Sequence, residues 1–199
     1  RKLTYAGLTA AALLTALAVA PAAANTYYVA PTGNNGNNGS SGSPWLTLQH
    51  AADLALAGDQ VVVQPGTYQG FNILHSGNDG APITFSAQPG VLINTAAPVL
   101  GAYGYQGLGQ HSRIYMYNVS YITVQGFEIS GTNNQTNSKE GIFIGADPIS
   151  NFGHISILNN NIHHNGDRNV LTSHVNDLTF ENNIFHEAYE EDRKSTRLN

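Results

Sequence analysis

Basic side chains are scarce in this 199-residue chain, and outside its two ends only Arg113, Lys139 and Arg168 carry a permanent positive charge. Lys139 is followed by Glu140, and Asp167 precedes Arg168, so two of these cations have a carboxylate beside them. A lysine or arginine in a groove can bind an anion or serve as a base, whereas carboxylate oxygens suit a hard cation such as Ca²⁺. Lys139 and Arg168 are therefore candidate catalytic residues and Asp167 is a candidate metal ligand, with solvated loop charges as the alternative.

Eight histidines raise the separate hypothesis of a transition-metal site. His163 and His186 occupy equivalent positions in two aligned segments, so we expect their rings to stack on adjacent strands, about 4.8 Å apart. Two imidazoles can contribute to a Zn²⁺ site, but no third ligand has convincing spacing, even with His164 and His174 nearby, and no His-Glu-x-x-His motif occurs. A polar surface ladder is the favoured interpretation. The acidic residues within 187–192 are interpreted as a solvated loop, with Ca²⁺ binding as the alternative.

Aromatic side chains offer a further kind of binding surface, because tyrosine rings stack on sugar rings. A sugar platform and ordinary strand packing are both open for Tyr103, Tyr105, Tyr115, Tyr117 and Tyr121. Asp147, which precedes a proline, is interpreted as a turn residue rather than a metal ligand.

Charge and cysteine content exclude several classes of partner. Charged residues make up 11% of the chain and the formal net charge is -5, so no basic field exists to attract nucleic acid or an anionic membrane. An acidic polysaccharide would also be repelled on average, so it would need local cations or a bridging metal ion. The absence of cysteine indicates an exported bacterial chain that relies on packing or repetition, and a monomer is expected.

The two ends differ in character from the rest of the chain. A basic start and an apolar, alanine-rich run give residues 1–24 the layout of a secretory signal peptide that is cleaved after Ala24. An uncleaved membrane anchor is the alternative. Residues 193–199 break the preceding pattern and resemble translated sequencing-adapter read-through, so the natural protein is expected to continue along another path. Residues 25–192 are then expected to be the N-terminal part of one truncated domain.

An internal repeat positions the candidate residues. The nine-residue segments that start at Ile122, Ile155 and Leu178 align without gaps, although their spacing along the chain is unequal. Apolar first and third positions indicate a strand with one buried face, and an apolar eighth position starts a second strand after a turn. Constant strands with variable loops predict an all-β parallel β-helix, in which each coil stacks on the next. The predicted core contains Ile122, Val124, Ile129, Ile155, Ile157, Ile162, Leu178, Phe180 and Phe185.

The apolar pattern outside the three aligned segments predicts the other elements of the coils. It predicts a strand at 26–30, a helix at 47–57, strands at 61–63, 83–85, 141–145 and 169–172, and turns at 65–68 and 88–90. The charged pairs at 139–140 and 167–168 lie just before the last two strands, so successive coils should bring the pairs together beside a groove. The helix is expected to cap the first coil. No cap for the last coil is visible, so Leu178, Phe180 and Phe185 should face water on their outer side.

Asparagine recurs at the sixth position of the last two segments, as Asn160 and Asn183. Stacked asparagines in a turn can hydrogen-bond along the solenoid and pair backbone groups that would otherwise be buried without partners. Two ordinary exposed turn asparagines are the alternative, and Phe127 interrupts the ladder in the earlier segment. Asn160 and Asn183 are therefore assigned a structural role.

On these residues, the chain resembles the pectate-lyase-like right-handed β-helix families, most closely the polysaccharide lyase family 9 type. The resemblance runs from Tyr27 to Tyr189 and is most specific near the N-terminus, in Tyr-Tyr-Val-Ala-Pro at 27–31, Pro-Trp-Leu-Thr-Leu-Gln-His-Ala-Ala at 44–52 and Pro-Gly-Thr-Tyr at 65–68. It implies a right-handed parallel β-helix whose first coil is plugged by a helix. The resemblance does not restrict the activity to one reaction, because hydrolases, epimerases, tailspikes and adhesins have the same fold.

A lyase of this family would cleave a uronate polysaccharide such as pectate or alginate by β-elimination, with aspartate-bound Ca²⁺ and a lysine base. Such a reaction needs a base for the proton beside the carboxylate and a cation that neutralises the carboxylate. The resemblance implies that the aspartates and the lysine lie mostly on coils past the end of this sequence, and no Asp-Asp cluster of that type is visible here. An extracellular lyase is the leading hypothesis. A hydrolase or epimerase on the same fold and a non-catalytic binding or adhesion β-helix are the alternatives.

Overall fold

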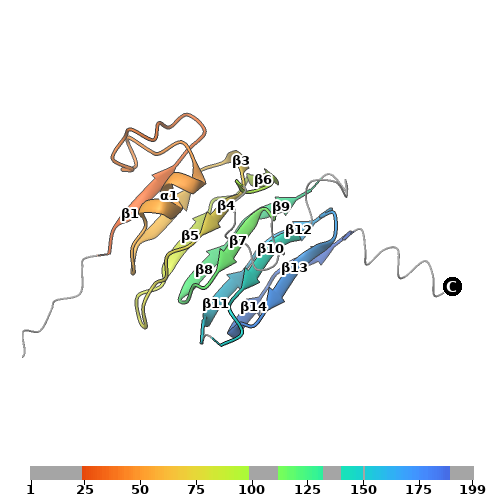
Figure 1. Ribbon diagram of the computed structural model, residues 1–199. Helices are drawn as coiled ribbons and strands as arrows, with labels where there is room; N and C mark the ends of the chain where they lie inside the picture. Colours follow the sequence, from red (N-terminus) through yellow and green to blue (C-terminus); the bar gives the residue numbers. More distant parts are fainter. Residues whose placement is uncertain (1–23, 99–111, 132–139, 150, 189–199) are drawn as a thin grey trace, which may run out of the picture.

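The computed structural model describes residues 24–98, 112–131, 140–149 and 151–188. In these ranges the chain winds into coils whose strands stack as three parallel sheets, with successive coils side by side along the molecule (Figure 1). The predicted all-β parallel β-helix with a short N-terminal helix is confirmed. Within the described residues no helix has the length and apolar character needed to cross a membrane. The predicted signal peptide, except Ala24, and the predicted tail lie outside these ranges.

Each inner coil contributes one strand to each sheet, in the order of the chain, whereas the first described coil contributes only β1 and the last only β14 and β15. The six-stranded sheet contains β1 (Thr26–Val29), β2 (Gln60–Val63), β5 (Ile83–Ala87), β8 (Ile122–Gln125), β11 (Gly153–Leu158) and β14 (Asn176–Glu181). The five-stranded sheet contains β3 (Gly66–Gln69), β6 (Val91–Thr95), β9 (Glu128–Ser130), β12 (Asn161–His163) and β15 (Ile184–His186). The four-stranded sheet contains β4 (Phe71–Ile73), β7 (Ile114–Tyr117), β10 (Glu140–Gly145) and β13 (Arg168–Ser173).

The three aligned segments pair in parallel and in the predicted register. Ile155 lies between Ile122 and Leu178 in one ladder, and Ile162 lies between Ile129 and Phe185 in another. The strands predicted at 141–145 and 169–172 lie within β10 and β13, which pair with each other. The repeat therefore places equivalent residues of successive coils directly beside one another.

The core is a column of alternate apolar side chains that point inward from all three sheets. Its centre includes Phe71, whose ring lies 5.0 Å from Phe85 and 6.5 Å from Phe127, measured between ring centroids. The predicted core residues of the two earlier segments are all buried, namely Ile122, Val124, Ile129, Ile155, Ile157 and Ile162. In the third segment Leu178 is partly buried, whereas Phe180 and Phe185 are 39% and 46% exposed. The expectation that all nine are core residues is therefore wrong for these two phenylalanines, and their predicted exposure is confirmed.

Several strand bounds differ from the sequence prediction by one or two residues, and two elements, α1 and β3, differ more. The helix α1 covers Leu48–Leu54 instead of 47–57, because Thr47 is its N-cap and accepts a hydrogen bond from the His50 N–H. The turn expected at 65–68 is correct only at its start. From Gly66 onward the chain forms β3, because its backbone pairs with β6 of the next coil.

Candidate functional site

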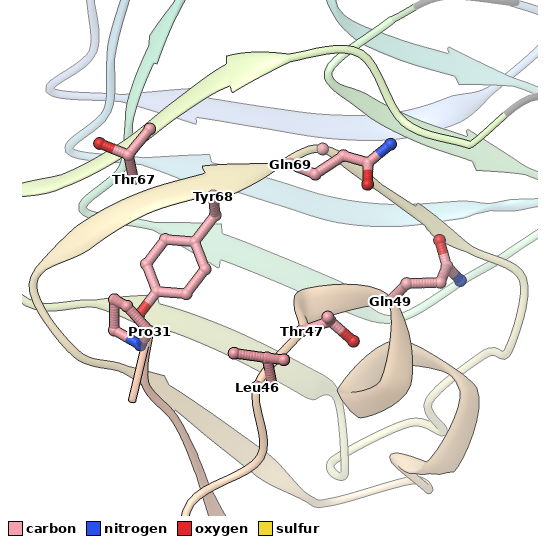
Figure 2. A pocket seen from close by; sticks show the side chains of 8 residues that line it. Pro31, Leu46, Thr47, Gln49, Thr67, Tyr68 and Gln69 are labelled. Carbon is pink, nitrogen blue, oxygen red and sulfur yellow. The ribbon is translucent and has the colours of Figure 1, made fainter. Parts of the chain in front are cut away.

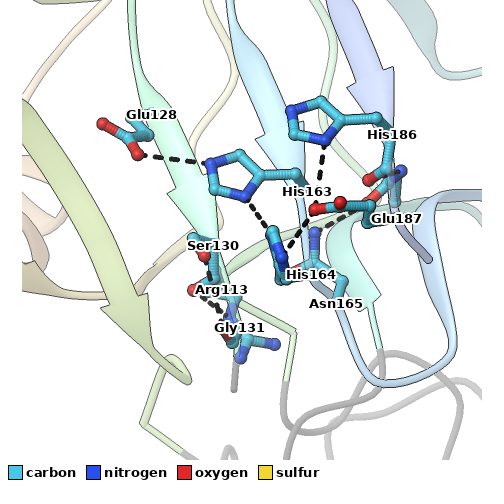
Figure 3. A network of polar contacts seen from close by, with 10 residues as sticks. Arg113, Glu128, Ser130, Gly131, His163, His164, Asn165, His186 and Glu187 are labelled. Atoms are coloured by element: carbon cyan, nitrogen blue, oxygen red, sulfur yellow. Dashed lines mark hydrogen bonds and ion pairs between the residues drawn. The ribbon is translucent and has the colours of Figure 1, made fainter. Parts of the chain in front are cut away.

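Polar side chains gather at the corner where each coil turns from the five-stranded sheet into the four-stranded sheet. The chain passes this corner between β9 and β10 and between β12 and β13, and Glu187 directly follows β15. Figure 3 shows several of the side chains and their contacts. We call this set the polar corner, and it consists of Arg113, Glu128, Ser130, Glu140, His163, His164, Asn165, Asp167, Arg168, Asn169, His186 and Glu187.

Arg113 is fully buried in the polar corner, directly before β7. Its Nε donates to the Ser130 carbonyl at 3.2 Å, whereas Nη1 and Nη2 have no hydrogen-bond partner among the described residues. Burial lowers the pKa of Arg113 to about 10, against the opposing effect of the Glu140 charge. A Cβ at Gly131 would lie 2.5 Å from the His164 carbonyl oxygen and 2.5 Å from Nη2, so any side chain there would force the backbone to shift. Buried cations with shifted pKa values are typical of functional sites, and sequence reasoning assigned Arg113 no role.

The predicted meeting of the two charged pairs is observed for the residues that the structure describes. Glu140 and Arg168 are register partners on β10 and β13. Arg168 Nη1 donates to Asp167 Oδ2 at 3.1 Å, and 45% of the Arg168 side chain is exposed. Lys139 lies outside the described residues, so its position beside Arg168 stays a prediction.

Glu140 is not a solvated loop charge, which corrects the alternative interpretation of its pair. It is the first residue of β10 and is buried, and its Oε2 accepts a hydrogen bond from Ser112 Oγ at 3.1 Å. All six residues of β10 are buried, so both faces of this strand are covered. Strands that are covered on both faces lose the alternation from which exposure is read in a sequence.

Four side chains of the polar corner form a compact cluster of metal-binding groups. The predicted stacking of His163 on His186 is observed, with ring centroids 4.7 Å apart and planes 7° apart. His163 Nδ1 lies 2.5 Å from His164 Nδ1, and His164 Nε2 lies 2.5 Å from Glu187 Oε2. His186 Nδ1 lies 3.4 Å from the same Glu187 oxygen. We call these four residues the histidine cluster.

The sequence analysis predicted the stacking of His163 on His186 but did not place His164 and Glu187 beside them, although the repeat contained a signal for both. His163-His164 and His186-Glu187 are adjacent pairs at the same two positions of successive coils. Parallel register places such pairs beside one another, so the repeat that predicted the stacked rings also brings their neighbours together. The statement that no third ligand has convincing spacing is therefore wrong for this cluster.

Ca²⁺ binding at Asp167 stays a prediction, because no described contact of Asp167 tests it. Its carboxylate is paired with Arg168, and the only group of three or more histidine or carboxylate ligands in the described ranges is the histidine cluster. Ca²⁺ takes six to eight oxygen ligands, whereas this cluster offers nitrogen from three imidazoles.

The described tyrosines of the possible sugar platform are buried or partly buried. Tyr115 on β7 is buried, and its ring stacks on Phe143 of β10 at 5.2 Å between centroids. Tyr121 is partly exposed and stacks on His154 at 4.5 Å. Tyr103 and Tyr105 lie outside the described residues. The described rings therefore pack mainly against the protein's own side chains.

Asp147 is the turn residue that the sequence indicated, and it also joins two coils. Its carboxylate accepts hydrogen bonds from Tyr117 Oη at 2.7 Å and Asn118 Nδ2 at 2.8 Å. The Asp147 backbone N–H donates to Asn118 Oδ1 at 2.8 Å. The bonds from Tyr117 and Asn118 lower the pKa of the Asp147 carboxyl.

A cavity of about 290 Å³ lies beside the capping helix, between α1 and β3 (Figure 2). The hydroxyl of Tyr68 in its wall donates to the Gln64 carbonyl at 2.7 Å, and burial raises the pKa of Tyr68 to about 12. Gln49 in the same wall accepts a hydrogen bond from the Asn72 N–H. The Gln49 contact holds the capping helix on β4, and the Tyr68 hydroxyl is bonded within its own coil, so the polar corner is the stronger candidate site.

Asn160 and Asn183 form hydrogen bonds along the solenoid at the turn where the sequence places them. The Asn160 N–H and Nδ2 both donate to Asn183 Oδ1, at 2.9 and 3.0 Å. Asn160 Nδ2 also donates to the Val124 carbonyl, and Asn160 Oδ1 accepts from the Phe127 N–H. Asn183 Nδ2 donates to the Ile157 carbonyl at 2.6 Å. The Phe127 side chain thus cannot extend the ladder, but the Phe127 backbone N–H still donates a hydrogen bond to Asn160.

Comparison with known families and proteins agrees with the β-helix geometry. A family model described as a Pel9A-like, right-handed β-helix region matches residues 27–195. The uncharacterized protein YwoF of Bacillus subtilis (strain 168) is 32% identical over 138 residues, which are 68% of this chain and 28% of YwoF.

Two solved structures share the fold. The GH136 lacto-N-biosidase from Eubacterium ramulus superposes with a TM-score of 0.57 at 17% identity, over 81% of this chain and 36% of that protein. Pectate lyase Pel9A superposes with a TM-score of 0.51 at 25% identity, over 70% of this chain and 34% of that protein. The chain thus spans about a third of the length of each of these relatives or less.

Proposed function

The chain belongs to the Pel9A-like right-handed β-helix family, and on that premise we propose that it is part of a secreted polysaccharide lyase. The substrate would be an acidic, uronate-containing polysaccharide such as pectate or alginate, cleaved by β-elimination. The observation that carries this proposal is the family match over residues 27–195, together with the likeness to pectate lyase Pel9A. Secretion is part of the proposal and is supported by the signal-peptide layout of residues 1–24.

β-Elimination at a uronate needs two functions that different side chains can supply. A cation must bind the carboxylate of the sugar, which makes the neighbouring C–H more acidic. A base must then take that proton. The glycosidic oxygen leaves from the adjacent carbon as the double bond forms between the two carbons.

Arg168 is suited to the first of these functions. Its guanidinium is half exposed at the polar corner, and only one of its donors is used by Asp167 among the contacts described. A guanidinium binds carboxylates through paired N–H donors and is a poor base, so Arg168 is suited to bind the carboxylate of the sugar and not to accept a proton. This division assigns carboxylate binding to Arg168 and leaves the base to Lys139, one residue before the register partner of Arg168.

The proposal is tested by incubating the protein with polygalacturonate and with alginate and following the ultraviolet absorbance of the unsaturated uronate product. Lys139→Ala should lower kcat by about 100-fold or more, the usual contribution of a general base. Arg168→Gln should mainly raise KM, because it removes a carboxylate-binding group. Asp79→Asn, which changes an exposed charge in the turn between β4 and β5, is the control and should leave both constants unchanged.

Two other outcomes would contradict the lyase proposal. New reducing ends without unsaturated product would identify a hydrolase. Binding of the polysaccharide without any cleavage would identify a binding or adhesion protein on the same fold.

A further inference from the structure

The histidine cluster offers the donor set of a transition-metal site. One ligand atom from each of His163, His164, His186 and Glu187 can be chosen so that all four lie within 4.8 Å of one another. Zn²⁺ binds imidazole nitrogen and carboxylate oxygen at about 2.0–2.2 Å, which places tetrahedral ligands roughly 3.4 Å apart. Rotations of partly exposed side chains close the remaining gap. We propose that the histidine cluster binds one Zn²⁺ ion through three imidazoles and one carboxylate.

A carboxylate outside the cluster orients one of the ligands. Glu128 Oε1 lies 3.2 Å from Nε2 of His163, on the side of the ring that faces away from His164. A hydrogen bond donated by Nε2 to Glu128 would leave Nδ1 with its lone pair free to bind a metal, and Figure 3 shows this Nδ1 facing His164. Carboxylate–histidine pairs of this kind fix the tautomer and the ring orientation of zinc ligands. Glu128 is thus a positioning residue for the site.

The donor atoms select the class of metal. Three nitrogen donors and one carboxylate are typical of Zn²⁺ and neighbouring first-row ions, whereas Ca²⁺ and Mg²⁺ require mostly oxygen. Four protein ligands complete a tetrahedral shell and leave no open position, which is the arrangement of a structural zinc site rather than a catalytic one. This inference does not depend on the proposed lyase activity, which involves Arg168 and Lys139.

The position of the cluster indicates what the metal would do. His163 ends β12 and His164 follows it, whereas His186 ends β15 of the next coil and Glu187 follows it. One ion would therefore link two successive coils by coordination bonds. The outer of these coils is weakly buried, since Phe180, Ile184 and Phe185 are all exposed. Zn²⁺ would hold this coil in register, because binding to a site that exists only in the folded state stabilises that state.

The test is a titration of the metal-free protein, made without a histidine tag, with ZnCl₂ in competition with a chromophoric chelator. We expect one ion per chain and a rise in Tm that EDTA reverses. His186→Ala should weaken Zn²⁺ affinity at least 100-fold, and Glu128→Gln about tenfold, the range for an outer-shell partner. His154→Ala, which removes a histidine that stacks on Tyr121 away from the cluster, should change the affinity less than twofold.

Three results would overturn the proposal. These are no stoichiometric Zn²⁺ binding, equal affinity in the wild type and the double variant His164→Ala/His186→Ala, or a Tm rise of the same size with CaCl₂. Circular dichroism of each metal-free variant shows whether it has folded. If the double variant does not fold, Co²⁺ bound to the wild type decides, because tetrahedral coordination gives intense visible bands and octahedral coordination weak ones. Weak bands would contradict a closed four-ligand site.

Discussion

The first and the last described coils form the two edges of the six-stranded sheet, with β1 and β14, yet they bury their apolar side chains to very different degrees. At the first coil, α1 places Leu48, Ala51 and Ala52 in the core, and the Trp45 ring stacks on Tyr27 at 4.5 Å. At the last described coil, no residue of β14 or β15 is fully buried. Figure 1 shows the helix beside β1 at one end and β13 and β14 at the other.

The comparison teaches that burial in a solenoid depends on the neighbouring coil. Phe180 occupies the repeat position of Ile157 and Val124, and all three point the same way, but only the latter two have a described coil on each side. A strand that pairs on one side keeps its register and loses about half of its packing partners. The direction of a side chain is therefore a property of its own coil, whereas its burial is a property of the coils around it.

The largest predicted effect contrasts an inner and an outer phenylalanine. Phe85→Ala should lower the free energy of unfolding by about 3–5 kcal/mol, because it removes a ring that is fully buried against Phe71 and leaves a cavity. Phe180→Ala should lower it by only about 1–2 kcal/mol, because 39% of that residue is already in water. Urea denaturation followed by circular dichroism measures both values. Equal losses would mean that the outer coil is as well packed as the inner ones.

The next effect in size concerns the asparagine ladder. Asn160→Ala leaves the Phe127 N–H and the Val124 carbonyl without their side-chain partner in a buried turn, so we expect a loss of about 2–4 kcal/mol. Asn183→Ala should lose about 1 kcal/mol, because Asn183 is only partly buried and water can replace its bonds. Thermal and urea unfolding of the two variants gives the difference. A larger loss for Asn183 would show that the outer turn is not solvated.

Much of the fold could be predicted because a β-helix repeats a short pattern. The alternation at Ile122 and Val124, repeated at Ile155 and Ile157, determines which face is inside and which strands pair. The start of β3 could not be predicted this way, because Pro65-Gly66 reads as a turn in isolation. The extended backbone of β3 is stabilised by pairing with β6 in the next coil. This pairing cannot be inferred from the residues next to Pro65 and Gly66 alone.

The candidate site was less predictable because its residues belong to loops and to strands buried on both faces. The stacking of His163 on His186 follows from register alone. The burial of Arg113 and Glu140 does not follow from register, because it depends on contacts with residues far away in the chain. Charges next to a turn are usually solvated, so sequence reasoning kept a solvated loop charge as the alternative for Glu140 and its neighbour. Its bond from Ser112, far away in the chain, could be found only in three dimensions.

The smallest predicted effect tests an exposed contact between two inner coils, as a counterpart to the buried ladder. Asp147 is partly exposed, and hydrogen bonds from Tyr117 and Asn118 lower the pKa of its carboxyl. A carboxyl whose pKa is lower in the folded than in the unfolded state adds stability above the unfolded value, about 3.9, and loses it as the pH falls through the folded value. Asp147→Asn should therefore lower Tm slightly at pH 7, by less than either asparagine variant, because water and salt screen exposed contacts. The difference from the wild type should shrink as the pH falls below about 4.

Asp79→Asn, in an exposed turn, is the matched control and should show no such convergence. A Tm difference for Asp147→Asn that is constant from pH 7 to pH 2 would show that charge on Asp147 does not contribute, and that shape alone joins these coils at their outer edge.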